Sequence, residues 1–422
     1  MTVCSVRHPK GWLPGGLLLL AISSAWAQAA PPGAVTTLKQ AFDSAWLRQP
    51  EARSQAARQQ AAVAHRQVAN SWTPEPASLE LSTKGDWLHG NQGSREFEVA
   101  LALPLWLPGE RARTGALADA EVRAGVSGLL AAQLRAATRV RESYWQWQRS
   151  LGEQALALAR LGNVQQLALD VAKRVKAGDL ARADQHQADG AVATAQAALA
   201  EAVSSLADAT NQLRALTGSA PVAAPDADAL TESVPDGSAE APLLGGRHPA
   251  LAELLDLAEV ARRAAELAQV QTRGNSELTL ATTRDRGDAA ESYQQSVTVG
   301  IRIPFGADSR NRAKRATAQA ELIEAEVQLG LEQERVLAEQ DTARVRLESA
   351  QQQVKAANWR LQLARESRSF VQKSYQMGES DLPTRLNVEL EATEAQRQAI
   401  RTRIDLAAAV SSLRQALGLL PE

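Results

Sequence analysis

Side chains that could carry catalysis or hold a metal are few and scattered in this chain. The histidines beyond the N-terminal segment are His65, His89, His186 and His248, and no two of them lie at metal-ligand spacing. The one cysteine is Cys4. No phosphate-binding glycine loop, zinc-protease motif or nucleophile elbow occurs. We therefore expect no enzyme, no cofactor and no resident metal.

Basic residues form two clusters, each just after a proline-marked segment. Three explanations are open: phospholipid headgroups, acidic residues of a neighbouring subunit, or a solvated face. Lipid headgroups are the preferred hypothesis, because cations at the start of a helix oppose its dipole and call for a compensating anion. The clusters are Arg111 and Arg113, and Arg310, Arg312, Lys314 and Arg315.

The overall composition favours long, closely packed helices. The chain has 422 residues and a formal net charge of -2, with only four Phe, three Tyr and two Met. Abundant alanine permits close helix packing, and a near-neutral charge gives no reason to propose a nucleic-acid partner.

Residues 1–27 are expected to be a secretory signal peptide. Arg7 and Lys10 precede a short apolar stretch, and Ala25-Trp26-Ala27 is a small-x-small cleavage site. The stretch is too short for a transmembrane anchor. Cys4 would leave with the signal, so the mature chain would have no disulfide.

The remainder is interpreted as a duplicated unit with an offset of 200 residues. Gly178 matches Gly378, and Leu213-Arg214 matches Leu413-Arg414. We divide the chain into a first repeat at 28–218, an equatorial linker at 219–247 and a second repeat at 248–422. Each repeat would contain a helix, two strands, a long helix and a return helix.

Four segments alternate apolar and polar residues as membrane strands do: 78–86, 95–105, 276–284 and 293–303. A half-buried sheet of a soluble protein would show a similar pattern. Aromatic residues at the segment ends suit membrane-interface girdles: Trp72, Trp87, Trp106, Tyr293 and Phe305. Four strands leave two open edges, which hydrocarbon does not tolerate, so several copies must pool their strands.

The predicted helices would form a long tube. Residues 109–177 and 308–377 lack proline and would each extend roughly 100 Å. Shorter helices at 181–217, 249–273, 384–417 and 37–71 would return alongside them. The stretch 219–246, rich in Ala, Pro and Asp, is expected to be a loosely packed linker.

The chain as a whole resembles the outer membrane efflux protein family, the TolC-like export ducts. Its passage Leu103 to Arg111 resembles the heavy-metal efflux subgroup of that family. The repeat of that passage, Ile303-Pro304-Phe305-Gly306, and the turns Val175-Lys176-Ala177-Gly178 and Tyr375-Gln376-Met377-Gly378 also match family features. The resemblance implies a mainly α fold with a membrane β-barrel: a homotrimer with a twelve-strand barrel and an α-helical periplasmic tunnel.

The resemblance also implies where partners and substrates meet the chain. The tips that dock a periplasmic adaptor would include Val175, Gly178, Asp179, Tyr375, Gly378 and Glu379. Candidates for the tunnel entrance are Asp184, Asp381, Thr384 and Asn387. The family's leucine between acids corresponds to Leu386, but Thr384 and Asn387 stand where acids would be. A six-acid ring is therefore not supported, and solvated turn acids are an equal alternative.

The predicted function is a channel subunit in the outer membrane of a Gram-negative bacterium, with most of the chain in the periplasm. It would be a passive conduit for metal ions or small toxic compounds, fed by an inner-membrane pump through the adaptor. The alternatives are a duct for type I protein secretion and a periplasmic coiled-coil scaffold without a pore.

Overall fold

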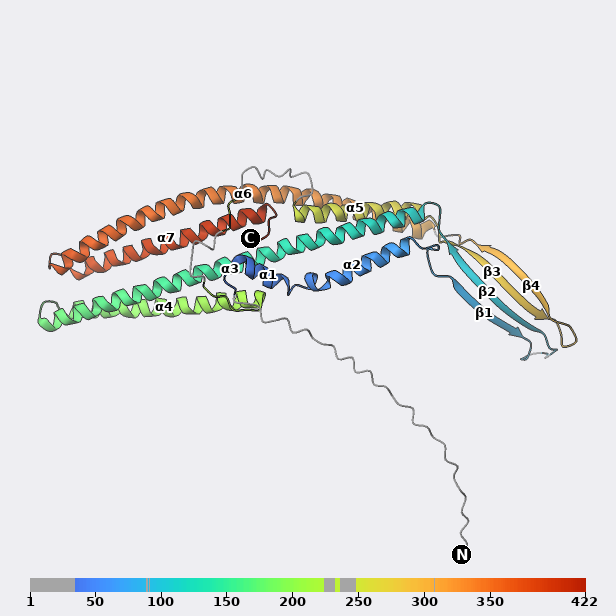
Figure 1. Cartoon of the computed structure of the whole chain (residues 1–422), viewed down its shortest axis with the longest axis horizontal. Coiled ribbons are helices and arrows are strands. Elements are labelled where there is room, and N and C mark those ends of the chain that lie inside the picture. Colours follow the sequence, from blue (N-terminus) through green and yellow to red (C-terminus); the bar gives the residue numbers. More distant parts are fainter. Residues whose placement is uncertain (1–34, 89, 91, 224–231, 236–247, 307) are drawn as a thin grey trace, which may run out of the picture.

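The computed structural model describes residues 35–88, 90, 92–223, 232–235, 248–306 and 308–422 (Figure 1). The predicted signal peptide, 1–27, lies outside the described residues. The molecule is elongated, with paired helices at one end and a small sheet at the other (Figure 1). The chain therefore separates a helical body from a strand region along its longest axis.

The two longest helices are nearly equal in length: α3 (Glu110–Ala177) has 68 residues and α6 (Asp308–Gln376) has 69. At 1.5 Å per residue each extends about 100 Å. The shorter helices are α1 (Leu38–Trp46), α2 (Pro50–Ala69), α4 (Arg182–Thr217), α5 (Pro249–Val270) and α7 (Leu382–Ala416). None of the helices among the described residues combines the length and apolar character needed to cross a membrane.

The single helix expected at 37–71 is wrong, because the structure breaks it into α1 and α2. Gln49 is extended, with ψ of 141°, and Pro50 opens α2 at its first turn. Proline lacks an N–H and its ring disfavours the α conformation in the preceding residue. Pro50 is thus tolerated at the start of a helix and excludes a continuous one.

Small residues allow the helices to pack closely in pairs. Helix α3 packs along α4, α6 packs along α7, and α5 contacts both α3 and α6. Many of the buried positions are alanines, such as Ala118 and Ala132 of α3 and Ala195 of α4. The result is two antiparallel hairpins, α3/α4 and α6/α7, lying side by side (Figure 1).

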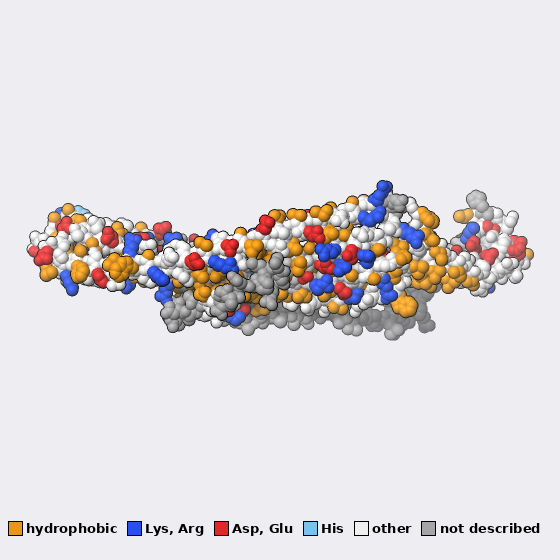
Figure 2. Space-filling model, turned by 90° about the horizontal axis from the view of Figure 1, so that it is seen from above, with side chains coloured by type: hydrophobic (Ala, Val, Ile, Leu, Met, Phe, Trp, Pro, Cys, Tyr) orange, Lys and Arg blue, Asp and Glu red, His pale blue; other side chains and the backbone are white. Residues whose placement is uncertain are grey.

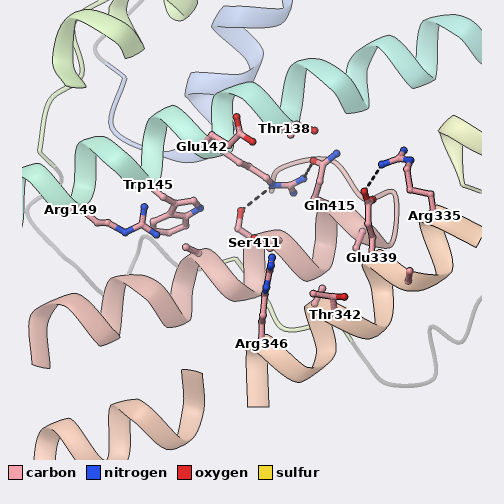
Figure 3. A pocket seen from close by; sticks show the side chains of 16 residues that line it. Thr138, Glu142, Trp145, Arg149, Arg335, Glu339, Thr342, Arg346, Ser411 and Gln415 are labelled. Carbon is pink, nitrogen blue, oxygen red and sulfur yellow. Dashed lines mark hydrogen bonds and ion pairs between the residues drawn. The ribbon is translucent and has the colours of Figure 1, made fainter. Parts of the chain in front are cut away.

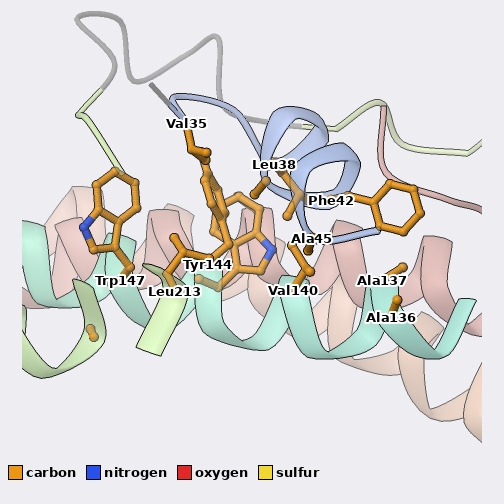
Figure 4. Close-up of a cluster of buried hydrophobic side chains, with 14 residues drawn as sticks. Val35, Leu38, Phe42, Ala45, Ala136, Ala137, Val140, Tyr144, Trp147 and Leu213 are labelled. Carbon is orange, nitrogen blue, oxygen red and sulfur yellow. The ribbon is translucent and has the colours of Figure 1, made fainter. Parts of the chain in front are cut away.

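The largest buried cluster lies midway along α3, where α1 crosses it (Figure 4). The cluster contains Phe42 of α1, Tyr144 and Trp147 of α3, and Leu213 of α4. The Tyr144 hydroxyl donates to the carbonyl of Thr36 at 3.2 Å, and burial raises its pKa to about 12. This neutral, hydrogen-bonded phenol fixes the N-terminal segment against the middle of the body.

The passage from strands to helices is organised by the buried carboxylate of Glu110. It accepts hydrogen bonds from the Leu107 amide at 3.0 Å and from the side chains of Gln271 and Asn275, each at 2.8 Å. Asn311, in the first turn of α6, donates to the carbonyl of Thr272. The segment joining α5 to the sheet is therefore held from both sides by the first turns of α3 and α6.

The strands β1 (Ser78–Gly85), β2 (Arg95–Leu105), β3 (Ser276–Arg286) and β4 (Gln294–Arg302) form one antiparallel sheet in the order β1-β2-β3-β4. Strands β1 and β4 are its edges. The register places Leu79 opposite Leu101, Leu101 opposite Leu280, and Leu280 opposite Val299. One face consequently carries an apolar row across all four strands.

That apolar face is exposed in the single chain, with Leu81 at 71%, Val299 at 69% and Ile301 at 64% exposure. The opposite face carries polar rows, such as Ser82, Glu98, Thr283 and Ser296 in register across all four strands. Cross-strand ion pairs join Lys84 to Glu96 at 3.8 Å and Glu277 to Arg302 at 3.2 Å. The sheet therefore has one largely apolar and one largely polar face, an alternation found in the strands of membrane barrels.

Candidate functional site

The two hairpin turns have the same backbone geometry. Gly178 and Gly378 are left-handed, with φ of 89° and 80°. The amide of Asp179 donates to the carbonyl of Arg174, and the amide of Glu379 donates to that of Ser374, both at 2.9 Å. This is the Schellman arrangement, in which glycine at the left-handed position avoids a Cβ penalty. Asp179 and Glu379 project from equivalent exposed positions at the tips.

The nearby acids Asp184 and Asp381 hold the starts of the return helices. A carboxylate oxygen of Asp184 accepts from the amide of Ala181 at 3.0 Å, and one of Asp381 accepts from the amide of Thr384 at 3.1 Å. The hydrogen bonds from Thr384 lower the pKa of Asp381. Each tip thus has one half of a capping box, using the third helical residue in α4 and the cap residue in α7.

A shared apolar cluster joins the two tips. It contains Leu167 and Val171 of α3, Ala188 of α4, and Tyr375 and Leu382 of the second hairpin. Val175, Leu180 and Leu386 pack against it and are half-buried. The tips therefore form one unit within a chain, although they are about 200 residues apart in sequence.

Tyr375 lies at the centre of this cluster and is only 1% exposed. The guanidinium of Arg174 lies 5.0 Å from its ring centroid, and that of Arg385 lies 4.8 Å from it. Arg174 also donates to the Tyr375 carbonyl at 3.4 Å. Two cations therefore flank one ring, and α3 is linked to the end of α6. Sequence reasoning placed Tyr375 at a docking tip but missed both arginines, because nothing local pairs them with it.

The other candidate residues are divided between surface and interior. Gly178, Asp179, Gly378, Glu379, Asp381, Thr384 and Asn387 are exposed, whereas Val175 and Asp184 are half-buried. The exposed set is available to a partner at the end of the molecule. The side chain of Tyr375 is available only through a rearrangement of the tip.

The predicted interface aromatics lie at the two ends of the sheet. Trp72, Trp106 and Phe305 are at the helical end, where Trp72 is 94% and Phe305 88% exposed. The Trp106 indole donates to the carbonyl of Ser71 at 3.2 Å. Trp87 and Tyr293 are at the far end, where Arg284 and Arg286 stack on Tyr293 at 4.8 and 4.9 Å. The two groups are separated by the length of the strands.

Sequence reasoning also missed a buried ion cluster at the middle of the body. Glu232, expected in a loosely packed linker, is 7% exposed. Its carboxylate contacts Arg141 of α3 at 2.9 Å and Arg414 of α7 at 3.3 Å. Arg414 also donates to Ser233 Oγ at 3.0 Å. At Glu232 and Ser233, therefore, the linker is fastened to both hairpins.

Beside this cluster is a cavity of about 600 Å³ between α3, α6 and α7 (Figure 3). Arg141 donates to Ser411 and Gln415 on one wall, and Arg149 and Arg335 lie on others. Among the described residues, no group of three or more His, Cys, Asp or Glu is placed to hold a metal ion.

Comparison with known proteins agrees with this architecture. Residues 41–219 match the family described as outer membrane efflux protein. No curated protein matches the sequence. A crystal structure of CusC is similar with a TM-score of 0.75 at 21% identity, covering 94% of this chain and 96% of that one.

Two further solved channels are similar to the same extent. VceC of Vibrio cholerae has a TM-score of 0.72 at 19% identity, covering 91% of this chain and 97% of that one. The open state of the MtrE outer membrane channel of Neisseria gonorrhoeae has a TM-score of 0.71 at 18% identity, covering 90% of this chain and 89% of that one. The chain therefore has the fold of these outer membrane channels, and within it residues 41–219 match the outer membrane efflux protein family.

Proposed function

We propose that this chain is one subunit of a trimeric channel in the outer membrane of a Gram-negative bacterium. The observation that carries the proposal is the sheet, whose exposed face is apolar across all four strands and whose edges, β1 and β4, are both open. Unpaired edges are not tolerated in hydrocarbon, so β4 of one copy must pair with β1 of the next. Three copies would supply twelve strands, an even number within the range of bacterial barrels.

The helical body supports a conduit below this sheet. Each chain contributes two hairpins of about 100 Å, long enough to span much of a periplasm. Their curved side-by-side arrangement in Figure 1 would form one third of a tunnel wall. Most of the chain would then be periplasmic.

At the far end, the exposed tip residues Gly178, Asp179, Gly378 and Glu379 would dock a periplasmic adaptor that connects the channel to an inner-membrane pump. Tyr375, with Arg174 and Arg385, would keep the two tips in register for docking. Metal ions or small toxic compounds are the proposed substrates, on the resemblance to heavy-metal efflux channels.

Disulfide trapping tests the pooled sheet directly. In a Cys4→Ser background, Ser82→Cys on β1 would be combined with a cysteine at Ser296, Thr298 or Gly300 on β4. Within one chain β1 and β4 are three strand spacings apart, about 14 Å, which is too far for a disulfide. We expect oxidation in outer membranes to give covalent dimers and trimers for one register of the three.

A matched pair, Ser82→Cys with Glu98→Cys, joins positions that face each other within one chain. It should give only monomers on denaturing gels. A chain that washes free of membranes without detergent, or that never forms intermolecular disulfides from the β1/β4 pairs, would support the pore-free scaffold and contradict the proposal.

The substrate is tested separately. A strain lacking the chain should become sensitive to metals or small toxic compounds, and the wild-type chain should restore growth. Loss of a secreted protein with unchanged metal and drug tolerance would instead indicate a type I secretion duct.

A further inference from the structure

We propose that the helical end of the sheet carries a binding site for anionic phospholipid headgroups, formed by Arg273, Arg310 and Lys314, with Trp72 and Phe305 exposed at the same end of the sheet. We call these five residues the interface collar. The inference rests on the proposed membrane function and adds a lipid class to it.

The collar cations lie where the connection between α5 and β3 contacts the first turn of α6. Arg273 follows Thr272, whose carbonyl accepts a hydrogen bond from Asn311. Arg310 precedes Asn311 in the first turn of α6, and Lys314 is one turn further along. The hydrogen bond between Asn311 and Thr272 therefore brings Arg273, in the α5–β3 connection, close to the start of α6.

All three cations are exposed, and none forms an ion pair with another of the described residues. Neighbouring basic residues differ. Arg113 is paired with Glu266 at 3.1 Å, and Arg111 donates to the carbonyl of Asn70 at 2.6 Å. Among the described residues, no ion pair thus compensates the positive charge of the collar.

Acids at this end of the body are largely engaged elsewhere. Of the acids whose side chains the structure describes here, Glu110 accepts three hydrogen bonds, Glu266 pairs with Arg113 and Arg263, and Glu277 pairs with Arg302, while Glu75 is exposed. A rotationally symmetric assembly would repeat the collar at the same height in every copy. Neighbouring copies would then add positive charge, so a neighbour's acids are a poorer explanation than an external anion.

The two aromatic residues of the collar indicate that the bound anion is a lipid headgroup. Trp72 is 94% and Phe305 88% exposed, and both lie where the apolar strand face ends. Figure 2 shows hydrophobic side chains gathered at this junction, with Lys and Arg over the adjoining helices. Amphipathic rings at the headgroup level next to basic residues are the pattern that holds anionic lipids. A soluble anion would explain the cations but not the exposed rings.

The test uses the full mature chain in nanodiscs with equal amounts of phosphatidylglycerol and phosphatidylethanolamine. After gentle detergent extraction, mass spectrometry would measure the ratio of the two lipids retained. Without screening by salt, each positive charge of the collar should increase the preference for an anionic lipid over a neutral one about fivefold. We expect wild-type protein to retain phosphatidylglycerol about tenfold over phosphatidylethanolamine, less so at high salt.

The variant Arg273→Gln/Arg310→Gln/Lys314→Gln should lose this enrichment and still assemble. A control, Lys355→Gln/Arg365→Gln/Lys373→Gln, removes three exposed cations from the distal half of α6 and should keep it. The charge-preserving Arg273→Lys/Arg310→Lys should also keep it. Equal retention of both lipids by wild type, or unchanged enrichment in the glutamine variant, would overturn the inference. Failure to enter a bilayer at all would instead overturn the proposed function.

Discussion

The two long helices have matching lengths and tips but very different surroundings. Helix α3 lies inside the chain, where it contacts α1, α2, α4, α5 and α7 and buries Tyr144, Trp145 and Trp147. Helix α6 packs only against α5 and α7 among the stronger contacts, and it leaves Leu331, Trp359 and Phe370 more than 60% exposed. The two helices therefore differ in burial although their lengths match: α3 lies in the core of the chain, and α6 lies at its edge with one face uncovered.

The difference between α3 and α6 also bears on how a helical body rich in alanine is stabilised. Helices of this length need neighbours, since isolated helices gain little from propensity alone. Helix α3 finds its neighbours within the chain. Helix α6 presents Ile323, Val327 and Leu331 at four-residue spacing on one stripe. In the proposed trimer that stripe would be covered by the next copy.

Truncating one tryptophan on each helix should separate these roles most clearly. Trp147→Ala removes a side chain that is 2% exposed and should reduce the free energy of unfolding by about 4 kcal/mol. Trp359→Ala, at 61% exposure, should change it by less than about 1 kcal/mol but weaken subunit association. Denaturant unfolding and gel analysis of trimers measure the two effects. Equal losses of monomer stability would remove the distinction between core and edge.

Removing the carboxylate of Glu232, which contacts both hairpins, should have the next largest effect on the free energy of unfolding. Glu232→Ala leaves Arg141 and Arg414 buried without their shared partner, which should lower unfolding stability by about 3 kcal/mol. Glu422→Ala is the control, because Glu422 contacts Arg414 from a side chain that is 57% exposed. Thermal unfolding in detergent compares them. Similar effects from the two variants would contradict a special role for the linker.

The two arginines that flank Tyr375 should contribute about equally to the stability of the tips, and less than Glu232 contributes to the stability of the chain. Arg174→Gln and Arg385→Gln each remove one cation from the ring and should each lower tip stability by about 1 kcal/mol. Limited proteolysis or hydrogen exchange at residues 167–190 and 375–390 reports the change. The control is Lys176→Gln, an exposed cation in the same turn.

The equivalent tip glycines offer a test of symmetry. Gly178→Ala and Gly378→Ala place a Cβ at a left-handed residue, and both sites are open, with nothing within 4 Å of the added atom. Each should cost about 1 kcal/mol through backbone strain alone. If bulkier residues at both positions leave trimers intact but abolish transport, the tips dock a partner. Full transport would contradict docking there.

Acid should loosen the start of α7 at the second tip. Because hydrogen bonds from Thr384 lower the pKa of Asp381, its carboxylate stabilises the start of α7 above the unfolded pKa of 3.8. That contribution is lost as the pH falls through the still lower folded pKa. Hydrogen exchange at Thr384 should therefore rise only in strong acid, and Asp381→Asn should abolish this pH dependence. An unchanged profile in the variant would assign it to another group.

Much of this fold was predictable because its signals are periodic or depend on proline. The strands and long helices begin and end within two residues of their predicted limits, for example at 109–177 against Glu110–Ala177 for α3. Alternation in β2 and β4 also predicted which face is apolar. Glycine at 178 and 378 marked the turns, since few other residues adopt that conformation without strain.

What sequence could not supply was contact between distant segments. Arg174 and Arg385 are ordinary helix-surface residues until the tips meet at Tyr375. Glu232 sits in a stretch whose composition suggests a loose linker, yet two arginines from different helices bury it. The break at Pro50 was readable in principle, but helical periodicity on either side concealed it.

The Glu110 carboxylate gives the molecule a graded stiffness. Three donors converge on it at the strand end, whereas at the opposite end a small apolar cluster around Tyr375, flanked by two half-exposed guanidinium groups, joins the tips. Movement of the two tips relative to each other should therefore require less energy than movement at the strand end. In the proposed channel, the tips could separate by loosening contacts of about 1 kcal/mol per cation while the strand end keeps its arrangement.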